Sequence, residues 1–373
     1  MAETVMKMYR DSLVTVNPTP GARNRPANWN YEIGVLLMSF ERLGQATGEE
    51  KYLQYTKKII DNLLMADGTI RTYKMEDYNI DNITTGRQLL KLYEVYKDEK
   101  YKKASVLLRS QLALQPRNKV GGFWHKLKYP AQMWLDGLYM AEPFYAAYTL
   151  RNNTPGDFDD VINQFVWMEK YSRDSITGLL YHAWDESKLQ KWANPVTGKS
   201  PGFWSRSMGW YLMALVDVLD FIPEQHPRRN ELIQILNRFS KAIVKYQDPS
   251  SGVWWQVTDK GTKHGNYLES SGSSMFVFGL AKAVRMGYID RSFIPAITKG
   301  YHGLIKEFTE TDSAGNLHLT KAVSVAGLGG NRDGSFEYYI SEPIRTDDFK
   351  AIGPFIQACL EMESINNKSE INK

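Results

Sequence analysis

Apolar residues recur at helical spacing through most of the chain, in segments of two alternating types. Residues 33–43 (IGVLLMSFERL) are apolar almost all round, whereas residues 51–65 carry apolar side chains on one face and lysines on the other. A helix that is apolar on every side is buried, and a helix with one apolar stripe is half exposed. The first segment therefore predicts an inner helix, and the second predicts an outer helix packed on it.

This pairing recurs along the chain. Further inner and outer helices are predicted at 81–97 with 99–114, 133–149 with 157–171, 205–221 with 228–247, and 271–286 with 291–308. A last inner helix at 347–363 has no partner after it, but an N-terminal helix carrying Val5, Met6, Tyr9 and Leu13 can close a ring beside it. Six such pairs predict an all-α fold, an (α/α)6 barrel formed by residues 1–373 as one domain. An open helical array is the alternative.

The long connections that lead from outer to inner helices lie at one end of such a barrel. Residues 121–132, 178–203 and 251–270 are rich in tryptophan and glycine and contain short strand-like runs. This composition predicts β-hairpin loops. Because binding and catalytic residues concentrate on loops held by a rigid scaffold, we expect the functional site at this end.

Most inner helices begin with polar residues, which helix capping explains. Asp136 differs, because it lies within the bulky segment MWLDGLYM (133–140). Burial favours the neutral form of a carboxyl group, so Asp136 is a candidate proton donor; a buried acid bound by backbone donors is the alternative. Asp81 holds a similar position one helical pair earlier, and a pair of carboxylates is the usual equipment for cleaving a glycosidic bond.

The surrounding polar and aromatic residues suit an acidic sugar. Aromatic faces stack on sugar rings, and Lys, Arg and His donate hydrogen bonds to a carboxylate. Taken singly, each tryptophan is explained by core packing and Arg206 by a surface ion pair. Their occurrence on one set of loops favours a binding site made of Tyr31, His125, Lys126, Trp134, His182, Trp204 and Arg206.

Composition and charge exclude several classes of protein. Hydrophobic residues make up 43% and aromatic residues 13% of the chain, enough for a sizeable core. The net charge of +4 comes without a basic run, so we expect a small acidic substrate and no nucleic acid. No stretch is apolar enough to span a membrane, and the start, MAETVMKMYRDSL, lacks the apolar segment of a secretory leader. With Cys359 as the lone cysteine, we expect a cytoplasmic protein.

Common catalytic and nucleotide-binding motifs are absent from the sequence. It contains no HExxH, no Cys–His zinc spacing, no phosphate loop and no GxSxG, so we expect neither a cofactor nor a metal. The glycine-rich segment 326–334 (AGLGGNRDG) opens no helix after a strand. We interpret it as a loop near the pocket and not as a nucleotide site.

Five motifs carry a resemblance to a known family. In chain order they are GGFWHK (121–126), QMWLDGLYM (132–140), GLLYHAWDE (178–186), FWSRSMGWY (203–211) and NYLESSGSS (266–274). Together they resemble the bacterial unsaturated rhamnogalacturonyl hydrolases of glycoside hydrolase family 105, which are related to the unsaturated glucuronyl hydrolases of family 88. The resemblance extends from about residue 28 to residue 360.

The resemblance implies an (α/α)6 barrel that acts inside the cell on small unsaturated oligosaccharides left by pectin lyases. Asp136 matches the family's catalytic aspartate, Asp81 matches a second acid, and the other candidate residues match positions that line the substrate. The implied reaction begins when Asp136 protonates C4 of the C4=C5 double bond in an unsaturated galacturonyl residue joined to rhamnose. Water then adds at C5, and the resulting hemiketal opens and expels the second sugar.

Two other functions remain open at this point. One is an inverting glycosidase that acts on saturated oligosaccharides with Asp81 and Asp136 as its acid and base. The other is a non-catalytic sugar-binding toroid. We expect a monomer or a homodimer in each case.

Overall fold

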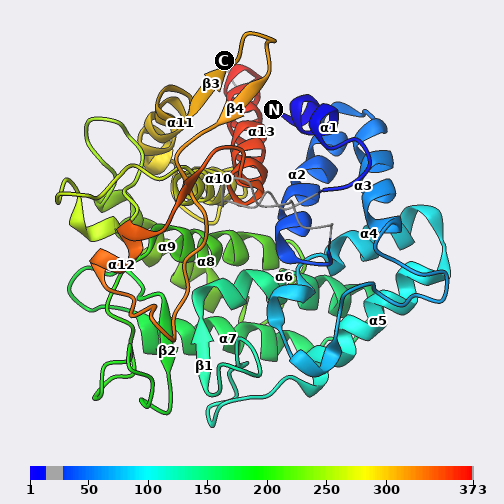
Figure 1. Ribbon diagram of the computed structural model, residues 1–373, viewed down its shortest axis with the longest axis horizontal. Helices are drawn as coiled ribbons and strands as arrows, with labels where there is room; N and C mark the ends of the chain where they lie inside the picture. The colour runs from blue at the N-terminus through cyan, green and yellow to red at the C-terminus, as the bar shows by residue number, and fades with distance from the viewer. Residues whose placement is uncertain (14–27, 372–373) are drawn as a thin grey trace.

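The computed structural model describes residues 1–13 and 28–371 and consists mainly of helices (Figure 1). The inner helices are α2 (Tyr31–Thr47), α4 (Gly86–Tyr96), α6 (Leu135–Asn152), α8 (Ser205–Val218), α10 (Ser270–Arg285) and α13 (Phe349–Ile371). The outer helices are α3 (Lys51–Asp61), α5 (Glu99–Leu114), α7 (Asp157–Ser172), α9 (Arg229–Lys245) and α11 (Ile294–Phe308), and a short α1 (Ala2–Met8) precedes them.

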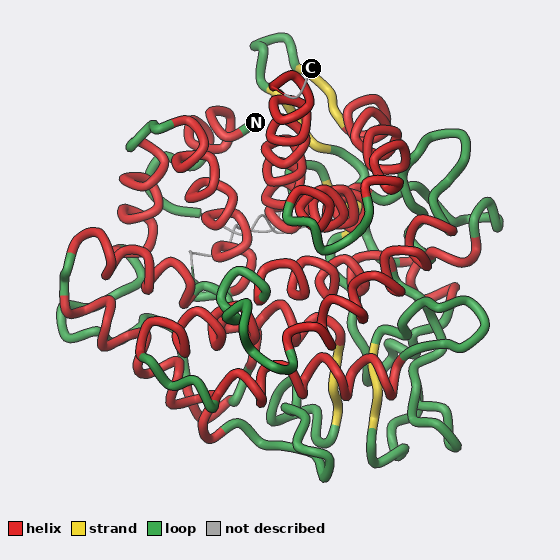
Figure 2. The backbone as a smooth tube through the Cα atoms, turned by 180° about the vertical axis from the view of Figure 1, so that it is seen from behind, coloured by secondary structure: helices red, strands yellow, loops and turns green. Residues whose placement is uncertain are grey.

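The inner helices form a closed ring. Each packs on the next in chain order, from α2 through α4, α6, α8 and α10 to α13, and α13 packs back on α2. The two chain ends consequently lie near each other, as Figures 1 and 2 show. The predicted (α/α)6 barrel is confirmed, and the open helical array is wrong.

Burial follows the two sequence patterns. Every residue of α8 is buried, whereas α9 buries one stripe that includes Leu232, Ile235, Leu236 and Phe239. Full burial of a leucine or phenylalanine side chain contributes about 1.5–3 kcal/mol, so these stripes hold the outer helices on the ring.

At the N-terminus, α1 is shorter than the predicted helix. Tyr9 follows it and packs edge-on against Phe349 of α13, at 5.2 Å between ring centroids.

Two inner helices begin later than predicted because another short element takes up their first predicted residues. Asp81 lies in a short 3-10 helix, η2 (Ile80–Ile83), and α4 starts only at Gly86. Thr85, between η2 and α4, is the N-cap residue of α4, and it lies directly against Gly34 of α2. A Cβ on Gly34 would come within 2.8 Å of the Thr85 Cα. The other late start is α6, which follows strand β1 (Gln132–Trp134) and continues through Pro143.

The long connections contain short strands that pair mainly between loops. Strand β1 pairs antiparallel with β2 (Ala183–Asp185), and β5 (Ala322–Val323) pairs with β6 (Ile344–Arg345). A true hairpin of two strands is formed by β3 (Thr309–Thr311) and β4 (Leu317–Leu319). Within the predicted hairpin loops as the structure describes them, the internal pairing consists of isolated bridges, Trp184–Lys199 in 178–203 and Trp255–Leu268 in 251–270. Two further bridges, Arg117–Phe123 and Arg173–Leu180, join the first two loops to the residues that precede them.

The remaining short elements are η1 (Met75–Asp77), η3 (Thr258–Lys260), η4 (Arg291–Phe293) and α12 (Phe336–Ser341). Over the two described ranges, no helix has both the length and the apolar character needed to cross a membrane.

Candidate active site

Asp136 and His182 face each other where β1 and β2 pair. Asp136 is the second residue of α6, and His182 immediately precedes β2. The strand register places Trp134 opposite Ala183, and the backbone N–H of Leu135 donates to the carbonyl oxygen of His182 at 3.0 Å. As a result, Oδ2 of Asp136 lies 3.1 Å from Nε2 of His182.

The Asp136 carboxylate has few partners. Oδ2 of Asp136 and Nε2 of His182 are close, but their geometry is not that of a hydrogen bond. Both atoms are buried, and neither has a hydrogen-bond partner among the described residues. In the same described ranges, no lysine or arginine forms an ion pair with Asp136. The side chain is 13% exposed, so this carboxyl group is shielded but still reachable.

His182 is held from its other side by Tyr339 of α12. The Tyr339 hydroxyl lies 2.8 Å from Nδ1 of His182, and the histidine is fully buried. When the hydroxyl donates to Nδ1, the hydrogen of a neutral imidazole is on Nε2, which faces Asp136. Tyr339 was not among the predicted site residues, because nothing in the segment FEYYIS (336–341) indicates that it reaches a histidine 157 residues away.

Asp81 has a strongly charged environment. Nζ of Lys126 donates to Oδ2 of Asp81 at 2.5 Å, and Nε2 of His125 lies 3.3 Å from Oδ1. Burial alone raises the pKa of a carboxyl group, but here the Lys126 ammonium, with His125, outweighs burial and lowers the pKa of Asp81 below its ordinary value. Asp81 is therefore held as a carboxylate.

Burial also sets the charge of His125. It lowers the pKa of His125 to about 4, even though the Asp81 carboxylate acts in the opposite direction, so the ring is neutral at pH 7. The imidazole stacks on Trp134 at 4.6 Å between centroids, and Tyr129 stacks on the same indole at 4.8 Å. Gly137 of α6 permits this close approach, because a Cβ there would lie 3.1 Å from Nδ1 of His125.

Trp204 and Arg206 do not have the open positions expected for residues that line a substrate. Each is only 1% exposed. The guanidinium group of Arg206 donates to Oγ of Ser271 at 2.6 Å and to the carbonyl oxygens of Val323 and Ser324 in and after β5. It also lies 3.6 Å from the Glu269 carboxylate. Through these contacts, Arg206 fastens the segment after α11 to the barrel.

The indole of Trp204 is covered as well. It stacks on the ring of Tyr339 at 6.0 Å, lies 4.9 Å from the ring of His182, and donates from Nε1 to Gln256 at 3.1 Å. With only 1% of Trp204 exposed, little of the indole is open to a ligand in this structure. Its contacts hold Tyr339 and His182 in place.

Tyr31 begins α2 and lies close enough to Asp81 to be affected by its charge. Burial raises the pKa of Tyr31 well above its ordinary value, and the Glu32 and Asp81 carboxylates add to this effect, so its hydroxyl stays neutral.

An open cavity of about 490 Å3 lies beside Lys126 and is lined by Asp77, Asn79, Lys126, Leu127 and Lys128. A cavity of this size can hold a small ligand.

The glycine-rich segment 326–334 lies beside this site. Leu328 packs in a cluster with Trp134, Ala183 and Trp192, and the backbone N–H of Gly327 donates to the Tyr338 hydroxyl at 2.9 Å. The expectation that this segment lies near the pocket is confirmed. It covers the outer side of the Trp134 indole.

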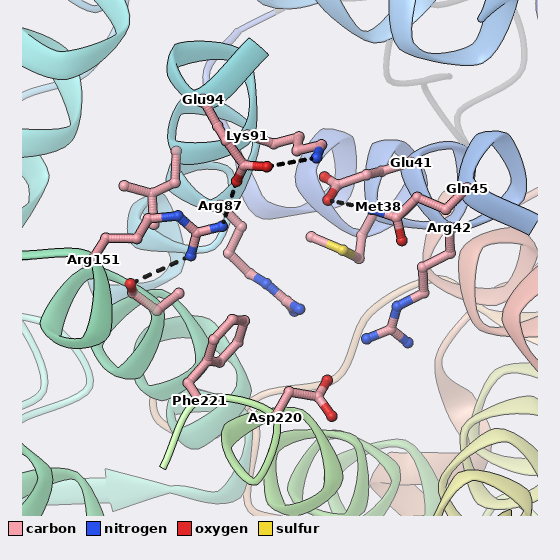
Figure 3. A pocket seen from close by; sticks show the side chains of 12 residues that line it. Met38, Glu41, Arg42, Gln45, Arg87, Lys91, Glu94, Arg151, Asp220 and Phe221 are labelled. Atoms are coloured by element: carbon pink, nitrogen blue, oxygen red, sulfur yellow. Dashed lines mark hydrogen bonds and ion pairs between the residues drawn. The ribbon is translucent and has the colours of Figure 1, made fainter. Parts of the chain in front are cut away.

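A second cavity, of about 300 Å3, lies toward the opposite ends of the inner helices (Figure 3). Its cations are bound to carboxylates: Arg42 and Arg87 share Asp217, while Lys91 and Arg151 share Glu94. The ion pairs give these cations a structural explanation, and Arg151, in the last turn of α6, also balances the dipole of that helix. The sequence-predicted residues lie at the other end.

The arrangement at the β1–β2 end combines two acids of different character. Among the described residues, no lysine or arginine pairs with Asp136, whereas Asp81 is held as an anion by Lys126. In the part of the chain that the structure describes, no group of three or more His, Cys, Asp or Glu side chains is placed to hold a metal ion. The site is thus equipped for proton transfer beside a fixed carboxylate.

Comparisons with known proteins agree with this geometry. The family model of Glycosyl Hydrolase Family 88 matches residues 1–366. The structure of a family 105 glycoside hydrolase from C. acetobutylicum ATCC 824 is 45% identical, covers 97% of this chain and 98% of its own, and superposes with a TM-score of 0.91.

Curated relatives are also similar. Protein Atu3128 of Agrobacterium fabrum is 37% identical over 230 residues, which are 60% of this chain and 97% of that protein. Unsaturated rhamnogalacturonyl hydrolase YesR of Bacillus subtilis is 29% identical over 262 residues, which are 69% of this chain and 70% of that protein.

Proposed function

We propose that this chain releases unsaturated galacturonic acid from unsaturated rhamnogalacturonan disaccharides. The chain matches the Glycosyl Hydrolase Family 88 model and belongs with the glycoside hydrolases of family 105. The family makes the protein a glycosidase that acts on unsaturated sugars. The choice of a rhamnogalacturonan fragment is supported by the similarity to YesR and by the five motifs described above.

The observation that carries the proposal is the contrast between the two acids. Asp136 lies 3.1 Å from His182 without an ion pair to lysine or arginine among the described side chains, whereas Asp81 is bound to Lys126. A carboxyl group that must give a proton to carbon and then take one from water has to exchange protons readily. Only Asp136 meets this condition.

The proposed reaction uses one carboxyl group twice. The Asp136 carboxyl donates its proton to C4 of the C4=C5 double bond, and positive charge develops at C5 and the ring oxygen. Water adds at C5 and loses a proton to the Asp136 carboxylate, which restores the acid. The hemiketal at C5 then opens, and collapse of the hemiacetal at C1 frees the second sugar, so that one water is consumed for each bond cleaved.

The positive side chains near Asp81 suit an acidic substrate. Lys126 and Lys128 line the 490 Å3 cavity and offer ammonium donors to the carboxylate of a uronic acid. Asp81 fixes the Lys126 ammonium in one place. We infer that Asp81 orders the binding surface and does not take part in proton transfer.

The test is incubation of the purified protein with an unsaturated galacturonyl–rhamnose disaccharide. Hydration of the C4=C5 bond removes the conjugation between the double bond and the carboxylate, so the ultraviolet absorbance of this chromophore should disappear as rhamnose is released. The proposal fails if the absorbance persists with every unsaturated uronide offered. Release of sugar from the saturated disaccharide would instead support an inverting glycosidase.

A further inference from the structure

A small internal cavity lies behind His125, between α6 and the connection that precedes it. It offers about 10 Å3 of space to the centre of a water molecule, close to what a single buried water needs. Its lining is apolar, including Phe123 and Met133, apart from the side chains of His125, Glu142 and Gln164.

Two polar atoms of these side chains have no partner in the described structure. Nδ1 of His125 and Oε2 of Glu142 are both buried and form no hydrogen bond. The amide of Gln164 is already engaged, because its Oε1 accepts from the Phe123 N–H at 2.9 Å and its Nε2 donates to Asp160 at 3.2 Å. Buried polar atoms are almost always hydrogen-bonded to protein or to ordered water, so the two free atoms point to a water between them.

We propose that Glu142 is a positioning residue that acts through one buried water on Nδ1 of His125, and thereby keeps the Nε2–H of His125 directed at Asp81. The Glu142 carboxyl donates to the water, the water donates to Nδ1, and Nε2–H points at Oδ1 of Asp81 across 3.3 Å. All donors and acceptors match in this order, and no proton has to move.

The charges around Glu142 support this order. Glu142 is 1% exposed, and burial raises the pKa of Glu142 well above its ordinary value, with the Asp160 carboxylate adding to the rise. Both effects favour the neutral acid, which has a hydrogen to donate. The opposite tautomer of His125, with the hydrogen on Nδ1, would turn the lone pair of Nε2 toward the Asp81 carboxylate, which is repulsive.

The hydrogen arrangement can be tested without turnover, by nitrogen NMR of the protein labelled with 15N in its histidines. The chain has six histidines, and His125→Gln identifies the signals of His125. In the wild type, Nδ1 of His125 should show the shift of an unprotonated, hydrogen-bonded nitrogen and Nε2 that of a protonated one. A wild-type spectrum with the hydrogen on Nδ1 overturns the proposal.

Two variants separate positioning from packing. Glu142→Leu removes the donor and should shift the Nδ1 signal or mix the tautomers, whereas Glu142→Gln keeps a neutral donor and should preserve the wild-type pattern. Unchanged His125 signals in Glu142→Leu contradict the proposal. If Glu142→Leu does not fold, the wild-type tautomer and the Glu142→Gln spectrum still decide.

The effect on turnover rests on the proposed function. Glu142→Leu should lower kcat/KM for the unsaturated disaccharide about 10-fold, which is typical when a partner of a functional histidine is removed, and Glu142→Gln should restore most of it. Equal losses in both variants would show that the carboxylate itself is needed and would overturn the proposal. If the wild type hydrolyses no unsaturated uronide, the proposed function fails while the NMR result still decides the role of Glu142.

Discussion

Two histidine–carboxylate pairs lie at the same end of the barrel, and they differ in charge. In the first pair, Asp136 faces His182, and Tyr339 is the third member. In the second pair, Asp81 faces His125, and Lys126 forms an ion pair with the acid. The first pair has no cation among the described residues, and the second has a fixed one.

This difference assigns separate tasks to the two acids. An ammonium group at 2.5 Å stabilises the ionised form of Asp81, so protonating it would break a buried ion pair. Asp136 loses no such interaction when it takes a proton. Similar histidine contacts thus yield one acid suited to proton transfer and one anion that orders its surroundings.

The largest expected effect is on Asp136. Asp136→Asn removes the group that donates and then recovers the proton, so kcat for the unsaturated disaccharide should fall by about 10^3-fold, within the range for loss of a general acid–base group. The measurement is the decrease in ultraviolet absorbance, with circular dichroism to confirm folding. A folded variant that keeps a tenth of the wild-type kcat would contradict the assignment.

The second prediction concerns the neutral His125. Its pKa in the folded protein is about 4 against an ordinary value of 6.5, so the unfolded chain binds more protons between these pH values. The contribution of His125 to the free energy of unfolding should therefore be constant above about pH 6.5 and decrease by about 3 kcal/mol as the pH falls to 4.

Urea unfolding of the wild type and of His125→Gln at pH 7, 5.5 and 4 measures this term. Asp81 does not interfere, because its lowered pKa confines its own loss of stability to pH values below about 3.8. Asp347 and Asp312 raise the pKa of His318, so its contribution to the free energy of unfolding changes with pH in the opposite direction. The contribution of His125 is therefore the difference in unfolding free energy between the wild type and His125→Gln at each pH. Parallel curves for wild type and variant would mean that His125 is not held neutral.

The third prediction separates binding from catalysis at Asp81. Asp81→Asn leaves Lys126 without its anion, so KM should rise about 10-fold while kcat changes by less than about 3-fold. If Asp81 were the general base of an inverting glycosidase, kcat would instead fall by about 10^2-fold or more. Steady-state kinetics on the unsaturated disaccharide distinguishes the two outcomes.

The smallest expected effect is at Tyr339. Tyr339→Phe keeps the ring that packs on Trp204 and removes the hydroxyl that bonds His182 at 2.8 Å. A hydrogen bond of this kind contributes about 1 kcal/mol, so kcat should fall about 5-fold with KM nearly unchanged. Ser341→Ala, which removes an exposed hydroxyl at the end of α12, is the matched control. Equal losses in both variants would indicate a general disturbance of α12.

Periodicity and motif order predicted much of this molecule. The alternation of fully apolar and one-faced helices gave the inner and outer rings, because helix burial is a local property of the apolar pattern. The bulky surroundings of Asp136 and the motif GGFWHK predicted a site at the end of the barrel where both aspartates and both histidines lie. The late start of α4 was missed, because it depends on the contact of Thr85 with Gly34 on another helix.

The sequence by itself determined the helical ring and the two aspartates, since both follow from residues close together along the chain. Only the tertiary structure decided which acid has a cation and that Arg206 and Trp204 are buried. It also placed the Tyr339 hydroxyl against His182, and Glu142 in the same small cavity as His125. These features depend on side chains from distant segments that meet at distances near 3 Å, such as His182 and Tyr339 at 2.8 Å. The spacing of residues along the chain does not predict such contacts, because they form only when the whole chain has folded.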